Sequence, residues 1–106
     1  MQPLIRGRIL QSSLAPLEGE LIEPLVRMGH AVIEQILSGA LDGPVDFDQD
    51  HDEWVILLDG GAELEVDDER LRMAPGDWML LPRGTPHRLV QTIPGSRWLA
   101  VRILGP

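Results

Sequence analysis

The side chains best suited to chemistry lie in two stretches of this chain. In the first, six carboxylates and one histidine crowd into twelve positions: Asp42, Asp46, Asp48, Asp50, His51, Asp52 and Glu53. In the second, His87 ends a segment rich in glycine and proline, GDWMLLPRGTPH. Carboxylates and imidazoles bind divalent cations, and both transfer protons in enzyme sites. The sequence therefore directs attention to cation binding and acid–base chemistry.

The acidic run superficially matches a calcium loop in the spacing of its aspartates. However, Glu53 stands at the sixth position, where such a loop needs glycine, and an apolar stretch follows where the loop needs a helix. A solvated edge is the commoner origin of a run of like charges. We therefore predict a strand whose even-numbered aspartates face solvent. The odd-numbered residues of the same stretch then face inward: Gln49, His51 and Glu53.

Turn residues define the elements that must position these side chains. Nine prolines and eleven glycines are spread along the whole chain, which is typical of many short strands. The predicted class is therefore all-β, a sandwich or a closed barrel. Apolar or alternating runs predict strands at 4–10, 31–37, 54–58, 62–66, 70–73, 78–81, 87–92 and 97–103. The stretch 20–28 stays open between helix and strand, because Pro24 interrupts its helical pattern.

Some of these strands carry further expectations. The run 54–58 is apolar at every position, so both of its faces should be covered. The ion pairs expected across a tight turn at 67–68 join Glu63 or Glu65 to Arg70 or Arg72. Trp54, Trp78 and Trp98 are predicted to fill the core or an interface.

The segment GDWMLLPRGTPH resembles the second conserved motif of the cupin family. The matching residues are Gly76, Pro82, Gly84 and His87. The first cupin motif ends in a glutamate and a glycine with six residues between them, and Glu53 and Gly60 match that spacing. This chain departs from the family at Gln91, where asparagine is usual. It also departs where two histidines usually precede the glutamate, at positions that here hold Phe47 and Gln49 or Asp46 and Asp48.

The resemblance covers residues 43–91 and implies a jelly-roll β-barrel of two antiparallel sheets. A chain of 106 residues has room for one domain. We therefore expect a single barrel domain over residues 1–106, with its motif-bearing core at 43–103.

The resemblance also implies a small-molecule pocket in the barrel and a divalent metal, of which manganese, iron, nickel and zinc are the candidates. The implied metal ligands are Gln49, His51, Glu53 and His87. Gln91 shares strand parity with His87, and Arg83 lies in the loop before it, so both are candidate ligand-binding residues. In the alternative, Glu53 and His87 form a polar pair in a metal-free pocket.

Two classes of function remain open. One is a binding or sensing module without turnover. The other is a metal-dependent enzyme of isomerase, oxygenase or decarboxylase type that acts on a small polar metabolite, with His51 as proton shuttle. The cupin barrel hosts both classes, so the fold does not choose between them. The missing histidines of the first motif favour the binding module.

Charge and composition exclude several other classes. Seventeen acidic residues oppose nine arginines and no lysine, and the net charge of −8 disfavours nucleic-acid and anionic membrane partners. The absence of cysteine excludes disulfides and iron–sulfur clusters. With neither a signal-peptide pattern nor an apolar run of membrane length, the predicted location is the cytoplasm. The exposed sheet edges of such a barrel predict a homodimer, with the N-terminal strand covering an edge of the partner.

Overall fold

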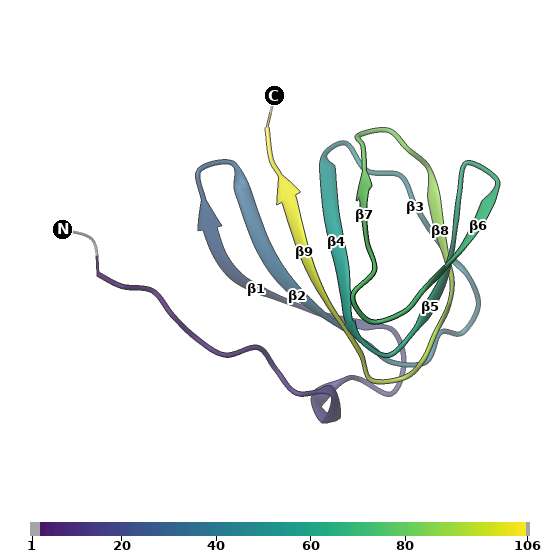
Figure 1. Cartoon of the computed structure of the whole chain (residues 1–106), viewed down its shortest axis with the longest axis horizontal. Coiled ribbons are helices and arrows are strands. Elements are labelled where there is room, and N and C mark those ends of the chain that lie inside the picture. Colours follow the sequence, from purple (N-terminus) through teal and green to yellow (C-terminus); the bar gives the residue numbers. More distant parts are fainter. Residues whose placement is uncertain (1–2, 106) are drawn as a thin grey trace.

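The computed structural model describes residues 3–105, which form nine strands and one short 3₁₀ turn (Figure 1). The elements are η1 (Ser12–Leu14), β1 (Glu20–Met28), β2 (Ala31–Ser38), β3 (Val45–Phe47), β4 (Asp52–Asp59), β5 (Ala62–Val66), β6 (Glu69–Met73), β7 (Trp78–Leu81), β8 (His87–Thr92) and β9 (Ser96–Ile103). Over this part of the chain, no helix has the length and hydropathy needed to cross a membrane.

The strands form two antiparallel sheets that face each other as a jelly-roll barrel. The larger sheet has the order β1-β2-β9-β4-β7, and the smaller has the order β3-β8-β5-β6. Figure 1 shows the larger sheet on the left and the smaller sheet on the right, with the N-terminal segment outside the larger sheet. The predicted all-β class and the jelly-roll architecture are confirmed.

The core lies between the two sheets and comes from alternate positions of their strands. In β4, Val55 and Leu57 are buried, whereas Trp54 and Ile56 point to the other face and are only half-buried. Leu64, Met73, Leu81, Leu89, Trp98 and Ala100 complete the inner cluster with them. The expectation that both faces of the apolar run 54–58 are covered is therefore wrong within this chain, because the outer face stays partly open.

The N-terminal segment is not the strand predicted at 4–10. Residues 3–11 pair with no strand. The segment is instead fixed to the larger sheet at one point, where Leu10 N donates to Gln35 Oε1 (2.7 Å) and Gln35 Nε2 donates to Leu10 O (2.8 Å). We call residues 3–9, which run outside the larger sheet and are largely exposed, the N-terminal arm.

The stretch 20–28, left open by the sequence, is strand β1 at the edge of the larger sheet. Pro24 is tolerated because an edge strand needs partners on one side only, and the register shifts between Pro24 and Val26. The other predicted strands lie within two residues of their expected bounds. The three-residue strand β3 was missed, because its alternation is too short to separate from the acidic run.

The β5–β6 hairpin confirms the expected ion pairs. Asp67 and Asp68 have φ angles of 48° and 64°, which suit the two central positions of a tight hairpin turn. Arg70 pairs with Glu65 (2.6 Å) and, at 3.7 Å, with Glu63, and Arg72 pairs with Glu63 (3.3 Å).

Candidate functional site

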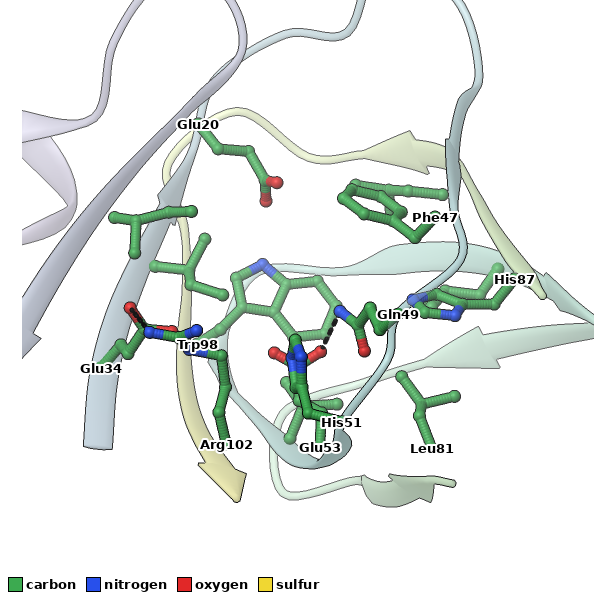
Figure 2. A pocket seen from close by; sticks show the side chains of 15 residues that line it. Glu20, Glu34, Phe47, Gln49, His51, Glu53, Leu81, His87, Trp98 and Arg102 are labelled. Atoms are coloured by element: carbon green, nitrogen blue, oxygen red, sulfur yellow. Dashed lines mark hydrogen bonds and ion pairs between the residues drawn. The ribbon is translucent and has the colours of Figure 1, made fainter. Parts of the chain in front are cut away.

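A cavity of about 340 Å³ opens between the inner faces of the two sheets (Figure 2). Apart from an ion pair described below, its polar lining residues are Glu20, Gln49, His51, Glu53 and His87. The rest of the wall is apolar and comes from strands of both sheets. The four residues implied as metal ligands by the sequence therefore line the same cavity.

The stretch that leads from β3 into the start of β4 delivers three of these side chains. Gln49, His51 and Glu53 line the cavity and the aspartates between them are exposed, as the predicted alternation requires, but the backbone bends at Asp50 and His51, so the predicted strand is continuous only from Asp52. Gln49 Nε2 donates to Glu53 Oε2 (2.7 Å), a contact visible in Figure 2. The Nε2 atom of His51 is buried and has no hydrogen-bond partner among the described residues. A buried imidazole nitrogen that carries no proton can accept a hydrogen bond or bind a cation.

The loop between β7 and β8 delivers His87, which is buried at the start of β8. Its Nδ1 lies 3.1 Å from Thr85 O. A carbonyl oxygen only accepts hydrogen bonds, so the neutral ring carries its proton on Nδ1 and keeps the Nε2 lone pair free. Phe47 stacks on the ring, with centroids 5.3 Å apart and planes 12° apart. Figure 2 shows the ring pointing toward Gln49.

The opposite wall holds an ion pair that the sequence did not suggest. The guanidinium of Arg102 in β9 lies 2.5 Å from the carboxylate of Glu34 in β2, which is buried. Beside this pair, the buried Trp98 donates from Nε1 to Ser38 Oγ (3.0 Å). Strand alternation could have indicated Glu34. It interrupts the apolar strand β2 and lies two residues before Ile36, so both side chains face the cavity.

Two predicted ligand-binding residues lie outside this cavity. Gln91 does not share the inward face of His87, because β8 carries an extra residue: Leu64 pairs with Leu89, but Glu63, which precedes Leu64 in β5, pairs with Gln91. This bulge reverses the strand parity, so Gln91 is exposed and Thr92 is buried instead. Arg83 is also exposed and points away, since its guanidinium donates to Gly105 O (3.1 Å).

The donor set fits a divalent metal in its chemistry more clearly than in its present geometry. Two imidazoles, one carboxylate and one amide oxygen are ligands that first-row transition metals accept. The unpartnered Nε2 of His51 is a buried nitrogen of the kind that such a metal binds. Yet in residues 3–105 no three His, Asp or Glu side chains converge closely enough to hold an ion. Metal binding would therefore require these side chains to move together.

The acidic run supports the first prediction. Asp48, Asp50 and Asp52 are exposed, as the sequence predicted, and Asp50 makes only a long contact with His51 Nδ1 (3.3 Å). Replacing Asp48 and Asp50 together by Asn should change the free energy of unfolding by no more than about 1 kcal/mol. Urea denaturation measures this change. A larger loss, or a fall in metal affinity, would place these carboxylates in the site.

Glu20 supports a second prediction, on pH. Most of the residue is exposed, but Figure 2 shows its carboxyl group pointing into the cavity. Burial there raises the pKa of Glu20 above its ordinary value of 4.5; the hydrogen bond from Ser38 Oγ (3.0 Å) opposes the shift, and the charge of Glu53 adds to it. The folded state thus holds this proton more tightly than the unfolded state does.

This difference should make the metal-free protein lose stability as pH rises above 4.5 and through the higher folded-state pKa of Glu20. Glu20→Gln should remove that part of the pH dependence. Unfolding in urea with a chelator present, repeated across this pH range, measures the effect. The free energies of unfolding of the two proteins should converge below pH 4.5, where the Glu20 carboxyl is protonated in the folded and the unfolded state. If the free energies of unfolding of wild type and Glu20→Gln instead differ by the same amount at every pH, the carboxyl group of Glu20 is fully hydrated.

Together, the barrel and its cavity define a jelly-roll protein with a polar site enclosed between two sheets. The chain belongs to the cupin domain family, whose sequence profile matches residues 32–101. The match begins in β2 and ends in β9, so it includes every residue predicted for the site.

Comparison with individual proteins adds detail. A segment of 44 residues is 41% identical to quercetin 2,3-dioxygenase of Bacillus subtilis; it is 42% of this chain but only 13% of that protein. A candidate mannose-6-phosphate isomerase from Ralstonia eutropha is 29% identical, with a TM-score of 0.75 over 93% of this chain and all of that one. A cupin superfamily protein from Desulfitobacterium hafniense has a TM-score of 0.69 at 19% identity, over 98% and 97% of the two chains. That last similarity shows the fold alone.

Proposed function

We propose that this cupin binds a small polar molecule in the barrel cavity together with a divalent metal ion. One observation carries the proposal: Gln49, His51, Glu53 and His87 line one cavity, and the buried Nε2 of His51 has no hydrogen-bond partner within residues 3–105. A buried polar atom without a partner costs free energy unless a ligand satisfies it.

The residues that would hold the metal are His51, Glu53 and His87, with the amide oxygen of Gln49 as a weaker fourth ligand. When bound, the ion supplies Lewis acidity and open coordination positions for a ligand. The chain's own residues orient the site. Thr85 O fixes the tautomer of His87, and Phe47 holds the ring plane.

Without a metal ion, the charges in the cavity favour a neutral or cationic ligand over an anion. Glu20 and Glu53 contribute negative charge, and Glu34 is matched by Arg102. Among the described residues that line the cavity, Arg102 is the only arginine, and its guanidinium is already engaged by Glu34. In the metal-free cavity, a phosphate would therefore meet two carboxylates without a free guanidinium to bind it, and only a bound metal ion could attract it.

Metal titration tests the proposal. Protein purified without an affinity tag is analysed for bound elements, stripped with a chelator and titrated calorimetrically with manganese, iron(II), nickel and zinc. We expect binding of at least one ion, with release of protons from the imidazoles. If the wild-type chain binds none of them more tightly than the Glu53→Gln/His87→Ala double variant, the cavity is a metal-free pocket and the proposal is overturned.

A metal-dependent enzyme is the second candidate, and similarity to the two named enzymes favours it. Turnover assays of the metal-loaded protein with quercetin and with mannose 6-phosphate separate it from a binding module. Because the guanidinium of Arg102 is already paired with Glu34 and cannot bind the phosphate group, we expect no turnover of the sugar phosphate. Turnover of either compound that the Glu53→Gln variant lacks would establish the enzyme.

Three further expectations from the sequence remain predictions: a single domain over residues 1–106, a cytoplasmic location and a homodimer. The homodimer was predicted through an N-terminal strand, which the structure does not contain.

A further inference from the structure

A chain of three hydrogen-bonded side chains runs along the wall of the cavity and ends in a carboxyl group. Trp98 Nε1 donates to Ser38 Oγ (3.0 Å), and Ser38 Oγ donates to Glu20 Oε2 (3.0 Å). Ser38 is fully buried and Trp98 is only 4% exposed. Two residues of the sheet interior therefore fix the position of one carboxyl oxygen at the cavity.

The strand registers account for this arrangement. Glu20 pairs with Ser38 and Ile22 with Ile36 across β1 and β2, and Ile36 in turn pairs with Trp98 in β9. Side chains two positions apart share a face of the sheet, so all of these face the interior. We call Ile22, Ile36 and Trp98, which all line the cavity, the apolar strip. The carboxyl group of Glu20 thus lies at one end of this strip.

Glu20 retains unused hydrogen-bonding capacity. Within residues 3–105, Ser38 is its one hydrogen-bond donor, although an ionised carboxylate has two acceptor oxygens. Glu34, another carboxylate that lines the cavity, is instead matched by Arg102. Burial also raises the pKa of Glu20, so its ionised form costs free energy that a cation beside it would offset. Glu20 is therefore an oriented acceptor that lacks a cation.

Trp98 limits what a ligand finds beside this carboxylate. Because its N–H donates to Ser38, the indole presents only carbon atoms and π electrons to the cavity. In the view of Figure 2, the ring lies between the carboxyl group of Glu20 and the side chains of Gln49 and Glu53. A carboxylate near an aromatic ring favours a cationic group, since the ring quadrupole and the negative charge both attract it. An ammonium group also supplies N–H donors for the free oxygen of Glu20.

We propose that Glu20 determines the specificity of the cavity by binding the ammonium group of a small organic amine, whose hydrocarbon part lies on the apolar strip. This inference names the ligand class and rests on the proposed function in one respect, that the cavity receives a small molecule. It does not require the metal ion, because the hydrogen-bonded chain contains none of the residues proposed to hold it.

NMR titration of the full chain with a chelator present tests the proposal. The three probes share one ring: cyclohexylamine, which is an ammonium ion at neutral pH, cyclohexanol and cyclohexanecarboxylate. The indole N–H resonance of Trp98 reports occupancy and is assigned by elimination with Trp54→Phe and Trp78→Phe. We expect cyclohexylamine to bind about 10-fold more tightly than cyclohexanol, because a charge-assisted hydrogen bond is stronger than a neutral one. Cyclohexanecarboxylate should bind most weakly.

Glu20→Gln should abolish this preference, so that cyclohexylamine binds no more tightly than cyclohexanol. Glu23→Gln is the matched control. It removes the same charge from the same strand, but Glu23 is exposed and does not line the cavity. This control should keep the preference of wild type for the amine.

Three outcomes would overturn the proposal: equal affinities of wild type for amine and alcohol, binding of neither, or equal losses in Glu20→Gln and Glu23→Gln. Circular dichroism checks the fold of each variant. If Glu20→Gln does not fold, the comparison of probes in wild type decides by itself. The chelator separates this result from the metal titration. A chain that prefers the amine but binds no metal keeps this inference and loses the metal, whereas metal binding without the preference does the reverse.

Discussion

His87→Ala and Glu53→Gln should each weaken metal binding by at least about 100-fold while the barrel stays folded. Loss of a residue that only supports a metal ligand already costs up to about 100-fold in affinity, so loss of a ligand should cost no less. The two side chains come from motifs on β4 and β8, and both line the cavity. Calorimetric titration of the chelator-treated variants measures the loss.

The double variant gives the sharper result. Ligands of one ion act as a unit, so Glu53→Gln/His87→Ala should lose little more affinity than either single variant. Binding to wild type should also weaken as pH falls, because protons compete with the metal for imidazole and carboxylate. Gln91→Ala is the control, since Gln91 is exposed on the same strand as His87. Losses that simply add, or a loss in the control, would contradict a shared ion.

The sequence predicted most of the fold because two physical regularities hold throughout the chain. Glycine and proline mark the turns, and the two-residue period of a strand separates inner from outer positions. The same period placed Gln49, His51 and Glu53 in the cavity and the neighbouring aspartates in solvent. A resemblance between motifs then added His87 from a strand far along the chain.

The predictions failed where tertiary structure overrides local pattern. The bulge in β8 inverts the parity at Gln91, and neither glycine nor proline marks it in the sequence. The arm alternates like a strand, yet it pairs with neither sheet, because alternation alone does not bring a segment to a sheet edge. The Glu34–Arg102 pair joins β2 to β9, and a contact between such distant positions is not visible in local spacing.

The motif glycines show how a family signature reflects packing as well as chemistry. Gly60 has φ +94°, and a Cβ built there would lie 2.1 Å from Ser96 Oγ and 2.8 Å from Ser96 Cα. Ser96 cannot yield easily: it is fully buried, and its hydroxyl accepts from Gly61 N (3.1 Å) and donates to Ile93 O (2.6 Å). Gly60→Ala should therefore destabilise the fold by about 3 kcal/mol or more, since strain and overpacking add.

Gly76 supplies the matched control for this loss. Its φ of +95° is nearly the same, but nothing lies within 4 Å of a Cβ built there. Gly76→Ala should therefore cost only the backbone strain, about 1 to 2 kcal/mol. Urea denaturation of both variants isolates the steric part as the difference between them. Because a domain of this size is stable by only about 5 to 15 kcal/mol, a difference of this kind is measurable. Equal losses at the two positions would mean that Ser96 moves aside, and that backbone conformation alone requires glycine at the end of the first motif.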